Sequence, residues 1–257
     1  MHALFMLGLF ALGPQTREPT PVTPERVAQA VAELKSGLAA SKPEERRAAI
    51  VTNSEVVDPA VVELIAKGLR DADTTVREAA AEALRFARHP AALTALSDAL
   101  KRERKSDKDP AWHAKLLKCV GQHQSESAVA LLAEKPLQHA DASIDEAQIL
   151  ALGNTRSRAG VEALFGMMRS ASREEIQKSM PNLRLALMVA TGVDHGLSQD
   201  AWTAWWNTNK AKFAPPREMP ALPLEMLNRW NGYWGLEYVR PREKKRDERG
   251  NDPERGK

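Results

Sequence analysis

The sequence predicts an all-α protein: a solenoid of about five stacked helix pairs, closed at its C-terminal end by a Trp-rich cap. Three observations predict this fold. Apolar residues recur with helical spacing, and no segment shows the alternation of Val, Ile and Thr that is typical of β-strands. Short signals also recur about every thirty residues, the length of one helix pair: Asp58-Pro59 returns as His89-Pro90, and Val120-Gly121 returns as Leu152-Gly153.

The clearest helix pair contains the run Asp71–Leu84. Its small apolar residues let a neighbouring helix approach closely, and Asp73 or Thr74 is placed to cap the helix. The partner helix is expected at Pro59–Leu69, with Asp58 as its N-cap and the proline in the first turn, where a missing N–H costs little. The apolar stripe of the second helix consists of Val76, Ala80, Ala83 and Leu84.

This pair resembles a HEAT repeat of the short, PBS-lyase-like type. The resemblance implies a ladder between the Asp and the Arg of neighbouring repeats, here Asp71 or Asp73 with Arg77, and a structural role for that ladder. The residues that carry the resemblance are Asp71, Asp73, Val76, Arg77, Ala79, Ala80, Ala83 and Leu84.

Residues 24–192 are expected to form the HEAT-like repeats. Ser143 with Glu146, and Ser172 with Glu175, have the spacing of capping boxes, and Pro181 should break or kink the last helix. The third pair carries a charged insertion at Arg102–Asp109. The five expected pairs are Thr23–Leu38 with Pro43–Thr52, Pro59–Leu69 with Thr74–Arg88, Pro90–Lys101 with Pro110–Val120, Glu126–Leu132 with Ser143–Leu152, and Ala159–Arg169 with Arg173–Thr191.

The N-terminal end has the pattern of a secretory signal. Residues 1–13 contain the apolar run Ala3–Leu12, which is far shorter than the ~20 residues of a membrane-spanning helix. Residues 14–23 are rich in Pro and Thr and predict an extended linker. We therefore expect an exported bacterial protein, periplasmic or extracellular, without a stable transmembrane span. A buried helix or a start codon placed too early are the alternatives for the apolar run.

Tryptophan is concentrated near the C-terminal end. In residues 193–213, Trp202, Trp205 and Trp206 share one helical face, and Ser198 or Asp200 could start that helix. This segment is similar to one that follows the repeats of exported bacterial HEAT-repeat proteins. A terminal repeat has no neighbour to cover its core, so we expect a cap; an aromatic surface for a ligand or partner is the alternative.

Residues 214–239 combine a Pro-rich hinge with a sparse aromatic stripe that includes Trp230 and Trp234. Gly232 and Gly235 weaken any long helix there. This segment could dock on its own solenoid or on a partner, because exposed Trp clusters are a liability for a soluble protein.

The positive charge of the chain lies in its tail. Residues 240–257 hold eight Lys or Arg and five Asp or Glu, a net charge of +3, and the whole chain has 37 against 34, also +3. The remaining residues are therefore balanced, which argues against a nucleic-acid groove. The tail should be disordered, and it could touch an anionic surface weakly.

No constellation of residues predicts catalysis, a cofactor or a metal. Cys119 is the single cysteine, so we expect a core residue, although His113 and His123 lie nearby in sequence. Asp194-His195 with Ser198 lacks the motif of a nucleophile elbow.

The function that this sequence favours is a non-catalytic protein–protein interaction scaffold, with a protein partner whose identity the sequence leaves open. The alternative is an enzyme or chaperone-lyase of the PBS-lyase-like HEAT type, acting on a bound cofactor or partner protein. A surface-tethered assembly factor, which uses the linker and the tail, is a variant of the first interpretation.

Overall fold

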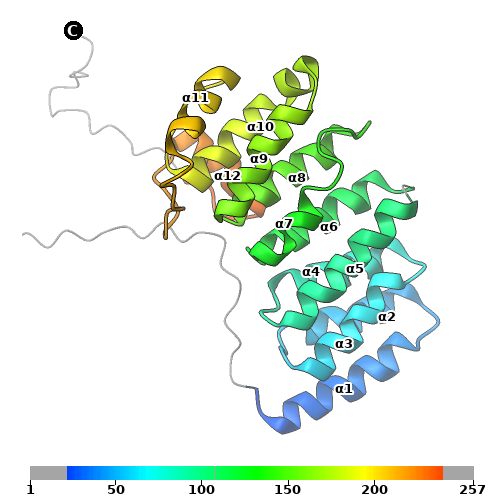
Figure 1. Cartoon of the computed structure of the whole chain (residues 1–257). Coiled ribbons are helices and arrows are strands. Elements are labelled where there is room, and N and C mark those ends of the chain that lie inside the picture. The colour runs from blue at the N-terminus through cyan, green and yellow to red at the C-terminus, as the bar shows by residue number, and fades with distance from the viewer. Residues whose placement is uncertain (1–21, 107, 240–257) are drawn as a thin grey trace, which may run out of the picture. The chain divides into compact units, whose positions relative to one another are not determined.

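The computed structural model describes residues 22–106 and 108–239. These described residues divide into two compact units, one that ends at Ala221 and one that begins at Leu222. Within the described residues the structure is helical and contains no strand (Figure 1). The helices of the first unit are α1 (Pro24–Leu38), α2 (Pro43–Asn53), α3 (Pro59–Lys67), α4 (Thr74–Phe86), α5 (Pro90–Ser106), α6 (Pro110–Gln122), α7 (Val129–Leu132), α8 (Ala142–Asn154), α9 (Arg158–Ser170), α10 (Arg173–Thr191) and α11 (Gln199–Asn209), with short 3-10 turns at Gly68–Arg70 and Glu126–Ala128.

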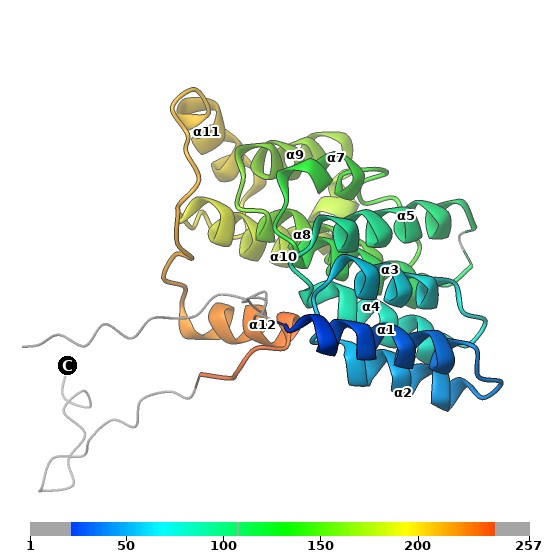
Figure 2. The same ribbon diagram turned by 90° about the horizontal axis from the view of Figure 1, so that it is seen from below.

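The first ten helices form five pairs of consecutive helices, and the pairs stack in two layers (Figures 1 and 2). The first helices of the pairs, α1, α3, α5, α7 and α9, follow one another in one layer. The second helices, α2, α4, α6, α8 and α10, form the other layer, in which each helix packs on the next. This arrangement confirms the predicted all-α solenoid.

Buried apolar stripes hold the layers together. On α4, Val76, Ala80 and Leu84 are fully buried, and burial of a Val or Leu side chain contributes about 1.5–3 kcal/mol. The stack is tight where α8 meets α10, because a Cβ on Gly153 would lie 2.7 Å from the Cβ of Ala186. The small residues therefore set the spacing of the second layer.

Side-chain caps start most of the helices where the sequence predicts. Asp58 accepts a hydrogen bond from Ala60 N (2.8 Å), and Asp73 caps α4. Ser172 and Glu175 form the predicted capping box. The capping box predicted for Ser143 and Glu146 is wrong, because Asp141 caps α8 instead. An Asp two residues before Ser143 reaches its backbone N–H, so α8 starts earlier than expected.

Two expectations about helix interiors are corrected. The insertion Arg102–Asp109 is not a separate loop, because α5 continues to Ser106 through long polar residues that favour helix. Pro181 does not end α10, which runs on to Thr191. Apolar residues on both sides of the proline, such as Met180 and Leu183, are buried, and their packing outweighs the lost backbone hydrogen bond.

The last helix of the first unit, α11, begins after Ser198, whose hydroxyl accepts from Ala201 N. The described part of the second unit holds α12 (Leu224–Trp234), which ends at Gly235 with a φ of 74°. The chain then turns back along the helix, where Asn228 exchanges two hydrogen bonds with Val239.

Residues 1–13, most of the predicted linker at residues 14–23, and the tail at residues 240–257 lie outside the described residues. Among the helices that are described, none combines the length and the apolar character that a membrane crossing requires.

Candidate functional site

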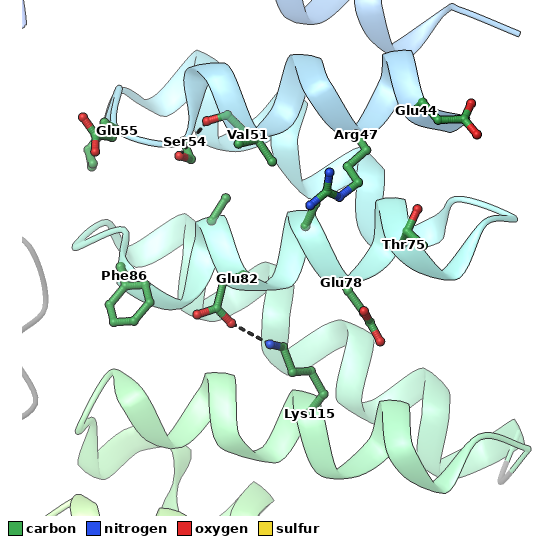
Figure 3. Close-up of a pocket in the computed structure, with 13 residues that line it drawn as sticks. Glu44, Arg47, Val51, Ser54, Glu55, Thr75, Glu78, Glu82, Phe86 and Lys115 are labelled. Atoms are coloured by element: carbon green, nitrogen blue, oxygen red, sulfur yellow. Dashed lines mark hydrogen bonds and ion pairs between the residues drawn. The ribbon is translucent and has the colours of Figure 1, made fainter. Parts of the chain in front are cut away.

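A groove crosses the second helices of the first three pairs, α2, α4 and α6 (Figure 3). Its volume is about 1130 Å³. Helix α4 contributes six of its thirteen lining residues, more than any other element. The lining residues are Glu44, Arg47, Val51, Ser54, Glu55, Val57, Thr75, Glu78, Ala79, Glu82, Ala83, Phe86 and Lys115.

The floor of the groove is apolar because α4 places small or aromatic side chains there. Ala79, Ala83 and Phe86 follow one another at helical spacing; Ala83 belongs to the buried stripe, and the other two border it. Across from them, α2 presents Val51, whose side chain is 50% exposed. An exposed valine that faces small alanines leaves room for an apolar side chain of another molecule.

Charged side chains rise along both sides of this floor (Figure 3). Glu44, Arg47 and Glu78 are exposed, and none of the three has an ion pair with another residue of the described segments. The lining contains four glutamates against Arg47 and Lys115. The groove is therefore acidic on balance.

Glu82 is held in the groove by two basic side chains. Its two carboxylate oxygens bind Lys115 (2.6 Å) and Arg85 (3.0 Å). Burial opposes its ionisation, but the hydrogen bond from Lys115 and the neighbouring positive charges outweigh burial and keep the pKa of Glu82 below its ordinary value. This bridge joins α4 to α6 and leaves Glu44 and Glu78 as the available carboxylates.

A ladder of ion pairs fixes the edge of the groove. Arg46 donates from Nε and Nη2 to the two carboxylate oxygens of Asp71, each at 2.7 Å. Arg77 repeats the arrangement one pair later, with Asp109 at 3.7 Å. Each arginine also donates to the two carbonyls five and six residues before it in the chain.

The ladder corrects the expected pairing of Arg77 with Asp71 or Asp73. The carboxylate of Asp71 belongs to the arginine of the preceding pair, and the carboxylate of Asp73 caps α4. The guanidinium of Arg46 holds the pKa of Asp71 below its ordinary value. The ladder therefore runs between neighbouring pairs, from an arginine to the aspartate that follows.

The opposite end of the second layer is tied by side chains that reach carbonyl groups at helix ends. His123 lies 3.1 Å from the carbonyl oxygen of Leu84, and Asn154 donates to the carbonyl of Gly121 at 3.0 Å. Each contact joins one second helix to the next through a carbonyl of a last helical turn, which also accepts from a backbone N–H. Both edges of α4 and α6 are therefore held in register.

The residues considered for metal binding are packed within or at the end of α6. Cys119 is fully buried, and burial raises its pKa to about 12, so the thiol stays protonated. His113 is buried, whereas His123 lies at the end of α6. Among the described residues, no three His, Cys, Asp or Glu side chains are grouped as metal ligands.

The sequence around Asp194 forms a turn. Arg184 binds the carboxylate of Asp194 through two hydrogen bonds of 2.8 and 2.6 Å, while the hydroxyl of Ser198 is used to cap α11. The ring of His195 packs edge-on against Trp202 at 4.9 Å. These contacts give each of the three residues a role in positioning α11.

The Trp face of α11 lies against the last helix pair. Trp206 stacks on Phe165 of α9, with ring centroids 4.9 Å apart, and Trp202 donates to the carbonyl of Gly196. Both indoles are buried, whereas Trp205 is partly exposed.

In the second unit, the rings of Trp230 and Trp234 lie 5.6 Å apart on α12. Both are buried. Docking of this segment, on its own solenoid or on a partner, stays a prediction.

The groove residues escaped the sequence analysis, although a signal for them exists. Glu78, Glu82 and Phe86 occur at steps of four along α4, which places them on one face, outside the buried stripe. Only the stacking of α2, α4 and α6 shows that this face meets its neighbours in a groove.

Comparison with known proteins identifies one family. The family model described as HEAT repeats matches residues 31–107, which include α2, α3, α4 and α5. None of the curated proteins compared with the chain matches it. The matched segment contains the helix pair whose residues carry the resemblance, Asp71–Leu84. Residues 31–107 of this chain are HEAT repeats.

Proposed function

We propose that this chain is a non-catalytic scaffold that binds an extended segment of a protein partner in the groove across α2, α4 and α6. The groove itself carries the proposal: successive HEAT repeats combine their second helices into one long surface. HEAT repeats generally serve as interaction scaffolds, and fold alone does not fix a function.

The chemistry of the groove favours a partner segment with apolar and basic side chains. An apolar side chain would cover Val51 and the alanines of α4, and the removal of this apolar surface from water would favour binding. A Lys or Arg would meet Glu44 or Glu78, which bind no cation of the described residues. Complementary charge of this kind raises the association rate and excludes acidic competitors.

Photo-crosslinking from the native cell tests the proposal. A photoreactive residue at Val51 should capture a protein that the same residue at Leu197, which is 60% exposed outside the groove, does not capture. The captured protein is then purified and titrated against the wild type, Val51→Glu and Glu78→Lys. We expect each substitution to weaken binding at least ~10-fold, the usual effect of truncating an important contact. Equal capture at both positions, or equal affinity of all three proteins, would contradict the groove.

We propose further that the protein is exported, on the basis of the apolar run Ala3–Leu12 and the linker that follows it. The mass of the native N-terminal peptide, together with the cell fraction, decides this. A mature chain that starts between Pro14 and Thr20 in the exported fraction supports export. An intact Met1 in the cytosol contradicts it.

A further inference from the structure

A second surface, on the opposite layer, carries positive charge that the described residues leave without partners. Arg70, in the turn after α3, and Arg102, on α5, are both exposed. Within residues 22–106 and 108–239, neither is joined to an acidic residue by an ion pair. Burial lowers the pKa of Arg102 most, the charge of Arg70 lowers it further, and the charge of Asp98 on the same helix raises it.

The two arginines line two adjoining hollows. One, of about 710 Å³, is also lined by Arg77 and Lys108 and contains Glu103 and Asp109 as its acidic residues. Its four cations and two carboxylates leave a formal charge of +2. We call this hollow the cationic cradle.

Both carboxylates of the cationic cradle are already engaged. Glu103 accepts hydrogen bonds from the backbone N–H groups of Lys108 and Asp109. Asp109 caps α6 by accepting from Trp112 N at 3.0 Å and faces Arg77. Neither of these two carboxylates pairs with Arg70 or Arg102, and the charge of Asp98 in the adjoining hollow opposes that of Arg102 only in part.

The second hollow is apolar at its base. It has a volume of about 680 Å³, is lined mainly by residues of α3 and α5, and shares Leu69, Arg70 and Arg102 with the cationic cradle. Val62 and Leu69 form its buried floor, and small alanines of α5 form one wall. An apolar side chain could therefore lie in this trough while an anionic group lies between the arginines.

We propose that this surface binds an acidic segment of a protein partner, with an apolar side chain in the trough and a neighbouring carboxylate held by Arg70 and Arg102. The planar guanidinium group matches a carboxylate with two parallel hydrogen bonds. Occupancy would also remove the repulsion between the two cations. The site shares no residue with the groove on α2, α4 and α6.

A protein segment fits this surface better than a nucleic acid does. Duplex backbone binding needs cations along an extended stripe, whereas here Glu63 and Asp98 line the same hollow as the two arginines. Carboxylates within a short cationic site repel a continuous polyanion more than they repel a short acidic segment.

Fluorescence anisotropy on the full chain tests the proposal with short labelled peptides. One peptide carries Leu-Glu-Glu-Leu between Gly-Ser flanks, and its partner carries Leu-Gln-Gln-Leu. We expect the glutamate peptide alone to bind, and the double variant Arg70→Gln/Arg102→Gln to weaken it at least ~10-fold. Lys105→Gln, a matched removal of charge from α5 outside both hollows, should change binding less than ~2-fold. If the double variant does not fold, the single variants are compared in the same way.

Four outcomes would overturn the assignment. They are no binding of the glutamate peptide by the wild type, equal binding of the two peptides, unchanged affinity in the arginine variants, and preference for a duplex oligonucleotide. A peptide with phosphoserine in place of both glutamates tests which anionic group the site prefers. If only that peptide binds, the ligand is a phosphoryl group and the proposed carboxylate is wrong. Val51→Glu should leave the glutamate peptide bound, so this proposal and the groove fail separately.

Discussion

At the scale of residues, the Arg46–Asp71 pair links two neighbouring repeats and should make stability depend on pH. The pKa of Asp71 is lowered from its ordinary value of 3.8 in the folded state. The pair therefore contributes above about pH 4, and its contribution is lost as the pH falls through the lower folded value. We expect Asp71→Asn to melt about 2–4 °C below the wild type at pH 7, the shift that ~1 kcal/mol gives in a domain of this size.

Thermal melts by circular dichroism at pH 7, 5, 4 and 3 check this. The gap between the wild type and Asp71→Asn should close below pH 4. Glu63→Gln, which removes an exposed carboxylate of α3, should melt close to the wild type at pH 7. A gap that is constant down to pH 3 would show that the lost side-chain shape, rather than the charge, is responsible.

The sequence analysis correctly predicted that Arg and Asp side chains form this ladder. The partner that it predicted for Arg77 was wrong. The resemblance to HEAT repeats implied a pairing of Arg77 with Asp71 or Asp73, but the carboxylate of Asp71 binds Arg46, 25 residues earlier. A contact of this length depends on how one repeat stacks on the next. No periodicity within a single helix reports that arrangement.

At the scale of elements, α8 and α10 approach each other closely at Gly153 on α8. A Cβ there would lie 2.7 Å from the Cβ of Ala186 and 2.8 Å from its Cα, so α8 and α10 would have to separate. We expect Gly153→Ala to lower the free energy of unfolding by about 1–3 kcal/mol, the usual cost of overpacking. Gly166→Ala is the matched control, since its Cβ would meet nothing nearer than 3.9 Å. It should be neutral or raise the stability by up to ~1 kcal/mol.

Urea denaturation of both variants measures the difference. A loss that is equal in Gly153→Ala and Gly166→Ala would contradict the close approach of α8 and α10. The comparison uses the same substitution on neighbouring helices, so helix propensity cancels.

Helix starts could be predicted from the sequence better than helix interiors and ends. A cap such as Asp58 or Ser172 acts within one turn, so its residues are adjacent in sequence. The continuation of α10 through Pro181 depends instead on apolar packing against other helices, and this outweighed the local preference of proline. The groove escaped prediction for the same reason, because its members come from three stacked helices.

At the scale of the whole first unit, a solenoid transmits stability only between neighbouring repeats. Trp206 closes the last pair by stacking on Phe165 of α9, whereas α2 and α4 lie several helices away along the stack. We expect Trp206→Ala to cost about 3–5 kcal/mol locally, as for other buried tryptophans. Trp205→Ala should cost less, because that indole is partly exposed.

Hydrogen exchange followed by mass spectrometry locates the loss. In Trp206→Ala, amide protection should fall in α9 and α10 and stay near the wild-type level in α2 and α4, where the proposed groove lies. The groove would then keep its affinity for a partner while the far end of the stack opens. A uniform loss of protection from α1 to α11 would show instead that the eleven helices unfold as one cooperative block, and that the Trp face stabilises the groove as well as the end of the stack.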